Sequence, residues 1–394
     1  MTTAQGALAA RHPLGPALAA AAILAVGMGF GRFAFTGLYP LMVQEQTLTV
    51  HSGTLAASMN YAGYLLGALL VARTGPSSAR LLCLWATVFN IASMAVLAYA
   101  DAAWAIIAVR GASGMASAAA MVGVSVWLMQ AVGDAQRAPL MFAGVGAGIA
   151  LSAELITLGH RGGMGSAGIW MLLALSSLAI AAVALPTMKR RAAESSPLPQ
   201  RQAAGTGPQG TRADAVKLIA LYGLAGFGYI VTATYLPLLM KEALPSADST
   251  QVWAVFGLGA VPSCFLWHAL HVRYGMRTSL VLNLVVQAAG VALPAVSHTA
   301  TAYLISALVV GGTFMGSTTI ALPAGQRLAH VVRFSMPAAM TAAFGVGQIT
   351  GPLVANFMYA RSGSFSGSLV TAAGALVLAA VLCLGVSVRK APSA

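Results

Sequence analysis

Charged residues are scarce in this chain of 394 residues. They make up 7% of the sequence, whereas a soluble domain carries about 25%. Hydrophobic residues make up 58% of the chain, so it lacks the polar side chains that a water-exposed surface of this size needs. The sequence therefore predicts an integral membrane protein whose surface faces lipid.

Acidic residues are the rarer of the two charged classes. The chain has 8 Asp and Glu against 21 Lys and Arg, which gives a net charge of +13. The basic residues fall in short clusters between apolar runs, and they form no basic face interleaved with aromatic residues. This pattern is typical of charge that sets membrane topology, so we expect contact with the lipid bilayer and no nucleic-acid partner.

The motifs of metal, redox and nucleotide chemistry are also missing. Cys83, Cys264 and Cys383 lie in apolar segments, without a CxxC pair or a histidine at ligand spacing, so we expect buried thiols. The glycine-rich stretch 27–31 is not followed by Lys-Ser or Lys-Thr and lies in an apolar run, which excludes a phosphate-binding loop. With no nucleophile–base pair either, we predict a protein that is not an enzyme and has no cofactor.

Long apolar segments dominate what is present. A helix needs about 20 apolar residues to cross the bilayer, and the run 14–43 is too long for a cleaved signal peptide. We therefore expect the first segment to stay in the protein and predict an all-α protein with twelve membrane spans. Their approximate ranges are 15–42, 52–72, 79–99, 102–130, 138–159, 165–186, 215–240, 250–270, 278–297, 300–323, 335–358 and 366–387.

The distribution of basic residues predicts the orientation, because cytoplasmic loops are enriched in Lys and Arg. With the N-terminus inside, only Arg161, Lys241 and Arg361 lie outside. We therefore predict a multi-pass protein of the bacterial cytoplasmic (inner) membrane with both termini in the cytoplasm. The inner basic residues are Arg11, Arg73, Arg80, Arg137, Lys189, Arg190, Arg191, Arg201, Arg212, Lys217, Arg273, Arg277, Arg327, Arg333, Arg389 and Lys390.

A repeat relates the two halves of the chain. Residues 29–32 (Gly-Phe-Gly-Arg) match 226–229 (Gly-Phe-Gly-Tyr), and Tyr-Pro-Leu at 39–41 matches Leu-Pro-Leu at 236–238, at the same offset of 197. The first spans of both halves run outward, so the repeat is parallel. The Pro-, Gly- and Ser-rich segment 187–213 is typical of a flexible cytoplasmic linker. We predict a bundle at 1–186, this linker, and a bundle at 214–394.

The pattern as a whole resembles the major facilitator superfamily. Residues 29–34 (Gly-Phe-Gly-Arg-Phe-Ala), 39–42 (Tyr-Pro-Leu-Met) and 345–352 (Gly-Val-Gly-Gln-Ile-Thr-Gly-Pro) are similar to its YbfB/YjiJ-type branch. The resemblance implies two pseudo-symmetric six-helix bundles that work by alternating access. It also implies that the first and fourth helices line a central cavity.

The cytoplasmic loops of that superfamily have a motif that this chain matches in part. Their pattern is Gly-x-x-x-Asp-Arg-x-Gly-Arg-Arg, but the acidic position is Ala72 in the first half and Val272 in the second. An acidic–basic latch is therefore in doubt, although the basic and glycine positions still suggest gating loops. The matching residues are Arg73, Gly75, Arg273, Gly275 and Arg277.

Three formally charged side chains fall inside the predicted spans: Arg32, Arg110 and Glu154. A charge near the bilayer centre costs about 2.5–3.5 kcal/mol on insertion scales, so such residues face a cavity and have partners. Arg32 and Arg110 each lie about nine residues, or ~13 Å, below the outer helix ends, and Glu154 lies about 8–9 Å below. We predict that both arginines bind a carboxylate and that Glu154 couples transport to protons. The alternative is a buried Arg–Glu group that only fixes helix packing.

Five uncharged polar residues complete the predicted substrate site. Tyr39 lies on the helical stripe of Arg32, and Tyr229 takes the place of Arg32 in the repeat. Gln348 lies in a helix weakened by Gly and Pro, where a polar group binds ligand or satisfies freed backbone groups. Asn60 and Tyr64, one turn apart, either face the cavity or hydrogen-bond between helices.

The predicted function is secondary transport of a small organic anion, coupled to protons as symport or antiport, by a monomer. The alternative is proton-antiport efflux of hydrophobic compounds. Two cavity arginines would repel cations, and the glycine-rich stretch 144–148 lacks the proline of exporter signatures. A non-transporting membrane sensor or assembly protein is the alternative from another class. The sequence does not identify the substrate or the direction of transport.

Overall fold

The computed structural model describes residues 14–188 and 210–386, and all secondary-structure elements in these ranges are helices. The predicted all-α fold is therefore confirmed. The longer helices are α1 (Gly15–Leu24), α2 (Ala34–Gln44), α3 (Val50–Leu70), α4 (Pro76–Leu97), α5 (Ala103–Val126), α6 (Ala138–Arg161), α7 (Ser166–Thr187), α8 (Arg212–Ala243), α9 (Thr250–Val296), α10 (Ala300–Arg327), α11 (Met336–Ser362) and α12 (Ser366–Leu384). The shorter elements are η1 (Ala25–Phe33), η2 (Trp127–Ala131), η3 (Ala135–Arg137) and η4 (Ala329–Val331).

The first membrane helix is continuous from Gly15 to Gln44 but changes its geometry in the middle. Its segment η1 is a π-helix, the wider form that is frequent at functional sites. Every residue of η1 is buried. Gly29 allows α6 to approach closely, because a Cβ there would lie 2.5 Å from Cα of Gly148. The wide segment thus lies deep in the protein, against the backbone of a neighbouring helix.

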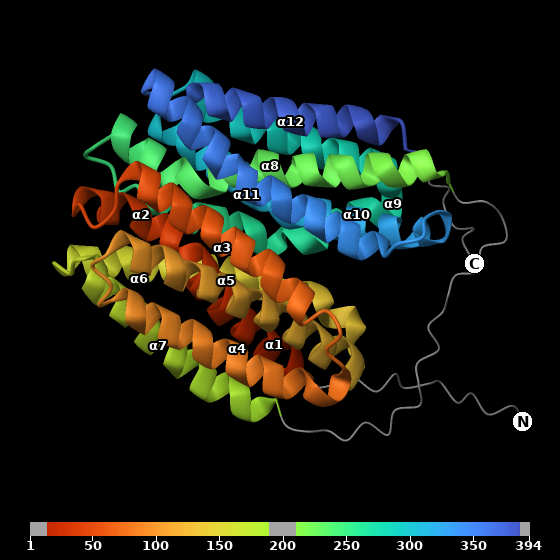
Figure 1. Ribbon diagram of the computed structural model, residues 1–394, viewed down its shortest axis with the longest axis horizontal. Coiled ribbons are helices and arrows are strands. Elements are labelled where there is room, and N and C mark those ends of the chain that lie inside the picture. Colours follow the sequence, from red (N-terminus) through yellow and green to blue (C-terminus); the bar gives the residue numbers. More distant parts are fainter. Residues whose placement is uncertain (1–13, 189–209, 387–394) are drawn as a thin grey trace, which may run out of the picture.

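The helices run between two ends of the molecule (Figure 1). We call one the distal end; it carries the connections 45–49, 98–102, 162–165, 244–249, 297–299 and 363–365. The other is the terminal end, where α1 and α8 begin and where α7 and α12 end. In Figure 1 the distal end is on the left and the terminal end on the right.

Ten helices in the described residues are long and apolar enough to cross a membrane, so the count of twelve separate spans is not confirmed. The helix α3 is not among the ten; its face toward the second half carries Thr54, Ser58 and Tyr61. The helix α9 has 47 residues and covers two predicted spans, 250–270 and 278–297. Gly275 interrupts its helical geometry with φ 81° and ψ 172°, a conformation that favours glycine.

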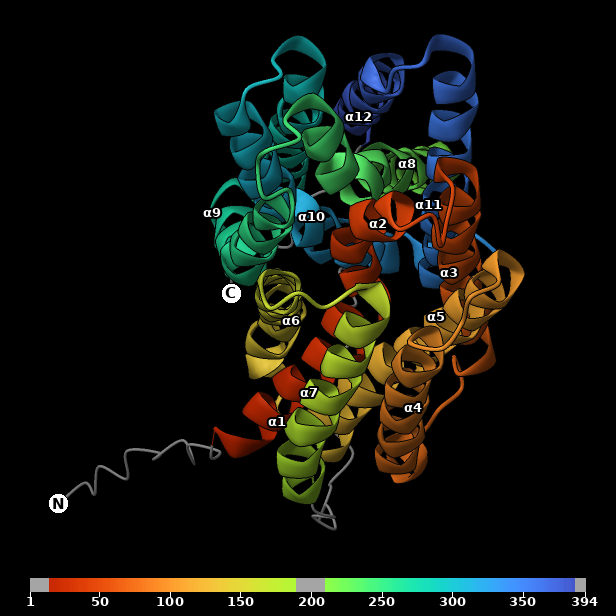
Figure 2. The same ribbon diagram turned by 90° about the vertical axis from the view of Figure 1, so that its left-hand side faces the viewer.

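Helices before residue 188 and helices after residue 210 form two neighbouring groups, seen from the distal end in Figure 2. Within the first group, α5 packs on α3 and α4, and α6 packs on α1. Within the second, α8 packs on α11 and α12, and α9 packs on α10. The groups meet chiefly where α3 packs on α11 and α6 on α9. All three cysteines are buried free thiols, as predicted.

Several residues named in the sequence analysis fall outside the described ranges. Most of the predicted linker 187–213 lies there. So do the basic residues Arg11, Lys189, Arg190, Arg191, Arg201, Arg389 and Lys390.

Candidate functional site

Arg32 is the centre of a buried polar cluster between the two helix groups. Its side chain is 3% exposed, and its Nη2 donates to Oε1 of Gln348 at 3.0 Å. The guanidinium lies 3.9 Å from the ring centroid of Tyr64 and 5.2 Å from that of Tyr61. Its Nε is buried and has no hydrogen-bond partner. Arg32 therefore has a donor available that a ligand oxygen can satisfy.

Gln348 extends this contact to the repeat counterpart of Arg32. Its Nε2 donates to the hydroxyl of Tyr229 on α8, while its Oε1 accepts from Arg32. Because the nitrogen and the oxygen of one amide are used in this way, Gln348 links the first helices of both halves. The structure thus brings together three of the predicted site residues, and Tyr64 with them.

Arg110 has a different set of partners. It is 2% exposed, and its Nη1 and Nη2 donate to the backbone carbonyls of Gly31 at 2.9 Å and Arg32 at 2.7 Å. Ser113 donates to the carbonyl of Gly31 at 2.8 Å, and Trp253 to that of Phe33 at 2.9 Å. These carbonyls lie where η1 gives way to α2, so the change of helical bonding makes them available to donors from outside. Arg110 holds the backbone that carries Arg32.

Aromatic rings surround the central cluster. Tyr229 lies 5.1 Å from Phe314 and 5.7 Å from Phe344, measured between ring centroids. Phe314 lies edge-on to Phe33 at 5.9 Å, and Phe344 stacks on Tyr222 at 4.6 Å. The guanidinium of Arg32 therefore lies among aromatic rings, whose faces attract a cation. In such apolar surroundings its electrostatic interactions are stronger than in water.

Among the described residues, hydrogen bonds between the two helix groups lie on one side of the molecule. In the described ranges they extend from Arg32 toward the distal end, and none joins the groups nearer the terminal end. The pairs are Arg32–Gln348, Trp253–Phe33, Thr36–Ala233, Tyr61–Thr234, Ser58–Ile349, Thr54–Tyr235, Thr54–Asn356, Asn356–His51, Gln251–Thr157 and Arg161–Asp248.

Tyr39 and Asn60 lie outside the Arg32 cluster. Tyr39 is fully buried nearer the distal end, where its hydroxyl donates to the carbonyl of Val50 at 2.7 Å. Asn60 donates to the carbonyl of Arg110 at 2.8 Å, so it joins α3 to α5 within the first group. Their contacts are those of helix packing.

Glu154 does not reach the arginines. Its side chain is exposed on α6, on the same face as Leu151 and Leu158, which are 46% and 61% exposed. The ion pairs of the described residues are Arg137–Asp134 and Arg161–Asp248. The expected proximity of Glu154 to Arg32 and Arg110 is therefore wrong: the turn of α6 that buries Ala153 directs Glu154 out of the bundle.

The predicted gating residues lie at the terminal end. Gly75 precedes α4 and Gly275 interrupts α9, while the side chains of Arg73, Arg273 and Arg277 are exposed. No ion pair involves these arginines in the part of the chain that the structure describes. This agrees with Ala72 and Val272 at the positions where the superfamily has acids.

Sequence reasoning missed Tyr61, Ser113 and the π-helix. Tyr61 donates to or accepts from Thr234 at 3.0 Å and faces Arg32. Its signal was available, because Thr54, Ser58 and Tyr61 recur at i, i+4 and i+7 and mark one polar face of α3. The bond of Ser113 to Gly31 had no comparable signal, since it depends on the widened backbone of η1.

Comparisons with known proteins agree with this architecture. The family described as "Uncharacterised MFS-type transporter YbfB" matches residues 24–384. No curated protein matches the chain. The crystal structure of the nucleoside transporter NupG is similar with a TM-score of 0.67 at 15% identity, covering 96% of this chain and 100% of that one. A crystal structure of a point mutant of NupG gives 0.68 at 14% identity, covering 94% and 99%.

The similarity to NupG shows a shared fold, and the family match covers most of the chain, so the resemblance found in the sequence is confirmed. A protein of this kind is a transporter of small molecules in a lipid bilayer and not an enzyme. The chain belongs to the YbfB-type family of the major facilitator superfamily, a multi-pass membrane transporter.

Proposed function

We propose that this transporter moves a small organic anion and that Arg32 binds its carboxylate. The observation that carries the proposal is the environment of Arg32: a buried guanidinium whose partners are an amide and aromatic rings, with one donor unused. A buried charge without a counter-charge is costly, and a bound anion would supply that counter-charge. Arg110 adds a second positive charge nearby while holding the backbone.

The aromatic residues support an organic anion over an inorganic one. Tyr64 and Phe344 are half-buried and come from opposite halves, α3 and α11. The exposed parts of these half-buried rings can contact an apolar body while Arg32 holds the acidic group, an arrangement common in small-molecule sites.

The proposed topology has twelve crossings in two bundles, 1–186 and 214–394, joined by the cytoplasmic linker 187–213. A helix of 21 residues such as α3 is ~31 Å long and spans the ~30 Å hydrocarbon core. The mean hydropathy of α3 is low because it contains polar residues, and these residues hydrogen-bond to the second half. The 47 residues of α9, broken at Gly275, give two crossings. An even number of crossings puts both chain termini on one side of the membrane, and the excess of Lys and Arg at the terminal end supports the cytoplasm of a bacterial cell as that side. The proposed working unit is a monomer.

Alternating access fits the one-sided hydrogen bonds. The hydrogen bonds between Arg32 and the distal end hold the halves together on the proposed outer side. In the described ranges the inner side has no such hydrogen bonds. We propose that the structure is the inward-facing state and that transport exchanges the distal ties for contacts at the terminal end. We also propose that transport is coupled to protons, but we assign no residue of the central cluster to proton transfer.

A nucleoside is the second candidate substrate. The structurally similar NupG is named as a nucleoside transporter. Here the rings around Tyr229 and the amide of Gln348 would suit a nucleobase. The uncompensated guanidinium of Arg32 favours an anion instead. Efflux of hydrophobic cations is not favoured, because Glu154 lies away from the cluster.

Ligand-dependent thermal unfolding of the purified protein separates these candidates. Small carboxylates should raise the melting temperature of the parent protein, and the shift should be clearly smaller in Arg32→Ala than in Arg32→Lys. Counterflow in proteoliposomes with the stabilising anion then measures transport, with and without a pH gradient. Stabilisation by nucleosides or lipophilic cations, with no response to carboxylates, would refute the anion proposal.

A further inference from the structure

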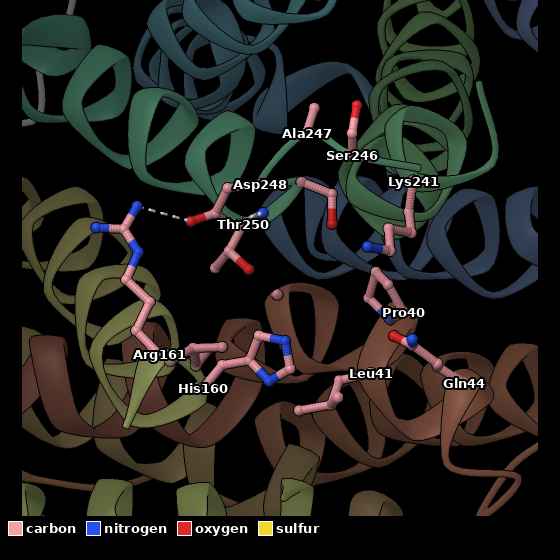
Figure 3. Close-up of a pocket in the computed structure, with 13 residues that line it drawn as sticks. Pro40, Leu41, Gln44, His160, Arg161, Lys241, Ser246, Ala247, Asp248 and Thr250 are labelled. Carbon is pink, nitrogen blue, oxygen red and sulfur yellow. Dashed lines mark hydrogen bonds and ion pairs between the residues drawn. The ribbon is translucent and has the colours of Figure 1, made fainter. Parts of the chain in front are cut away.

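A polar cavity lies between the two halves at the distal end, and Arg32 is not among the residues that line it (Figure 3). It has a volume of about 280 Å³. Its walls come from the end of α2, the end of α6, the end of α8, the connection 244–249 and the start of α9. This volume is near the lower limit of pockets that bind small molecules, which is about 300 Å³.

The cavity collects positive charge at the end of the molecule where basic residues are rarest. Of the three basic residues expected on the outer side, Arg161 and Lys241 both line it, one from each half. The third, Arg361, lies over the ring of Phe357 at 4.1 Å. His160 also points into the cavity in Figure 3.

One carboxylate, Asp248, belongs to the lining, and it is already engaged. Its Oδ2 pairs with Arg161 at 3.3 Å, and its Oδ1 accepts from the backbone N–H of Thr250 at 3.2 Å. Lys241 donates to the carbonyl of Pro245 at 2.8 Å. An ammonium has three donors, so this bond to an uncharged carbonyl leaves two N–H groups of Lys241 for an anion. It also leaves the positive charge of Lys241 without a counter-charge from Pro245.

Neutral polar groups complete the lining. Gln44 extends its amide toward the cavity from α2, and Thr250 supplies a hydroxyl group from the opposite wall (Figure 3). Together with the two cations they match the needs of a carboxylate, which accepts several hydrogen bonds and favours charged donors.

We propose that this cavity is a second anion site, which binds a small carboxylate between Lys241 of the second half and the His160–Arg161 corner of the first. The site does not include Arg32 and is independent of the central substrate. Because both halves contribute cations, a bound anion stabilises the closed distal end. An anion on the outer side thus favours the inward-facing state by mass action.

Binding of succinate to the full-length Arg32→Ala protein in nanodiscs tests the site with the central site disabled. Isothermal titration should show saturable binding of succinate and none of its neutral analogue succinamide. Lys241→Gln and Arg161→Gln should each weaken binding at least tenfold. Arg361→Gln, which removes a cation of the same end outside the cavity, should leave binding unchanged. Asp248→Asn should tighten binding severalfold, because it removes the competing carboxylate.

The proposal is overturned if Arg32→Ala protein binds no succinate, or if Lys241→Gln and Arg161→Gln bind it as Arg361→Gln does. The Arg161 side chain is 68% exposed, so its variant tests the site even where another variant unfolds. Loss of carboxylate transport in Arg32→Ala with retained succinate binding separates this site from the proposed central one.

Discussion

The opening helices of the two halves carry the same Gly-Phe-Gly motif but have different backbones. In the first half, residues 25–33 form the π-helix η1; in the second, the matching residues 222–230 lie within the regular helix α8. The carbonyls of Gly31, Arg32 and Phe33 accept bonds from Arg110, Ser113 and Trp253. No side chain of the described residues donates to the matching carbonyls at 228–230.

This difference teaches what the buried arginines do. A widened helix makes its carbonyls available, and a guanidinium with paired donors satisfies two of them at once. Arg110 therefore supports the backbone of η1 through two of its nitrogens, whereas Arg32 bonds the side chain of Gln348, and in both arginines the buried Nε has no partner. The regular helix α8 needs no such support, and its counterpart of Arg32 is the neutral Tyr229.

The largest expected effect is the loss of stability in Arg110→Ala. Bonds to a charged donor contribute about 1.5–3 kcal/mol each, so losing two should lower the free energy of unfolding by about 3 kcal/mol or more. Thermal unfolding in detergent, followed by tryptophan fluorescence, measures the change. Arg32→Ala, which removes one bond to Gln348, is the matched control and should lose less. Equal losses in both variants would contradict the scaffold role of Arg110.

The next effect concerns the close packing of the two helices. A Cβ at Gly29 would meet the backbone of Gly148 at 2.4 Å, whereas one at Gly228 would first meet Leu376 Cγ at 2.3 Å and would meet backbone, the carbonyl oxygen of Ala372, only at 2.9 Å. The Leu376 side chain can rotate, but the backbone of α6 cannot move alone. We therefore expect Gly29→Ala to cost about 3 kcal/mol, the upper part of the usual range for overpacking, and Gly228→Ala to cost less. The same unfolding measurement tests this order, which a smaller loss in Gly29→Ala would reverse.

A smaller effect is expected in Tyr229→Phe. The substitution keeps the aromatic contacts and removes the hydroxyl that accepts from Gln348. One neutral hydrogen bond contributes about 0.5–1.5 kcal/mol, so stability should fall slightly and the response to carboxylates should persist. If this response fell as far as it should in Arg32→Ala, the hydroxyl of Tyr229 would have to contact the anion itself.

The smallest effect is expected in Glu154→Gln. The carboxylate is exposed beside Leu151 and Leu158 and has no part in the Arg32 cluster. Carboxylate binding and the rate of anion counterflow in proteoliposomes should stay within about twofold of the parent. A loss of pH-gradient-driven transport, with counterflow intact, would restore Glu154 as the coupling residue that its place in the sequence suggested.

The central cluster was partly predictable. Arg32, Gln348, Tyr229 and Tyr64 were found because polar residues in apolar helices need partners inside the protein. Glu154 was misplaced because neither depth nor angle on its own helix tells which neighbour, if any, covers that face, and this face of α6 is exposed. The role of Arg110 was missed because its partners are backbone carbonyls, which every residue has.

The sequence by itself determined that this protein spans a membrane, that it is helical, that its halves are related and that it belongs to its transporter family. Apolar length, loop charge and motif spacing are local properties, and they can be read along the chain. The tertiary structure alone decided that residues 25–33 widen, that Arg110 bonds backbone carbonyls while Arg32 bonds Gln348, and that Arg161 and Lys241 line one cavity. These depend on contacts between residues far apart in the chain, for which a single sequence contains no distances.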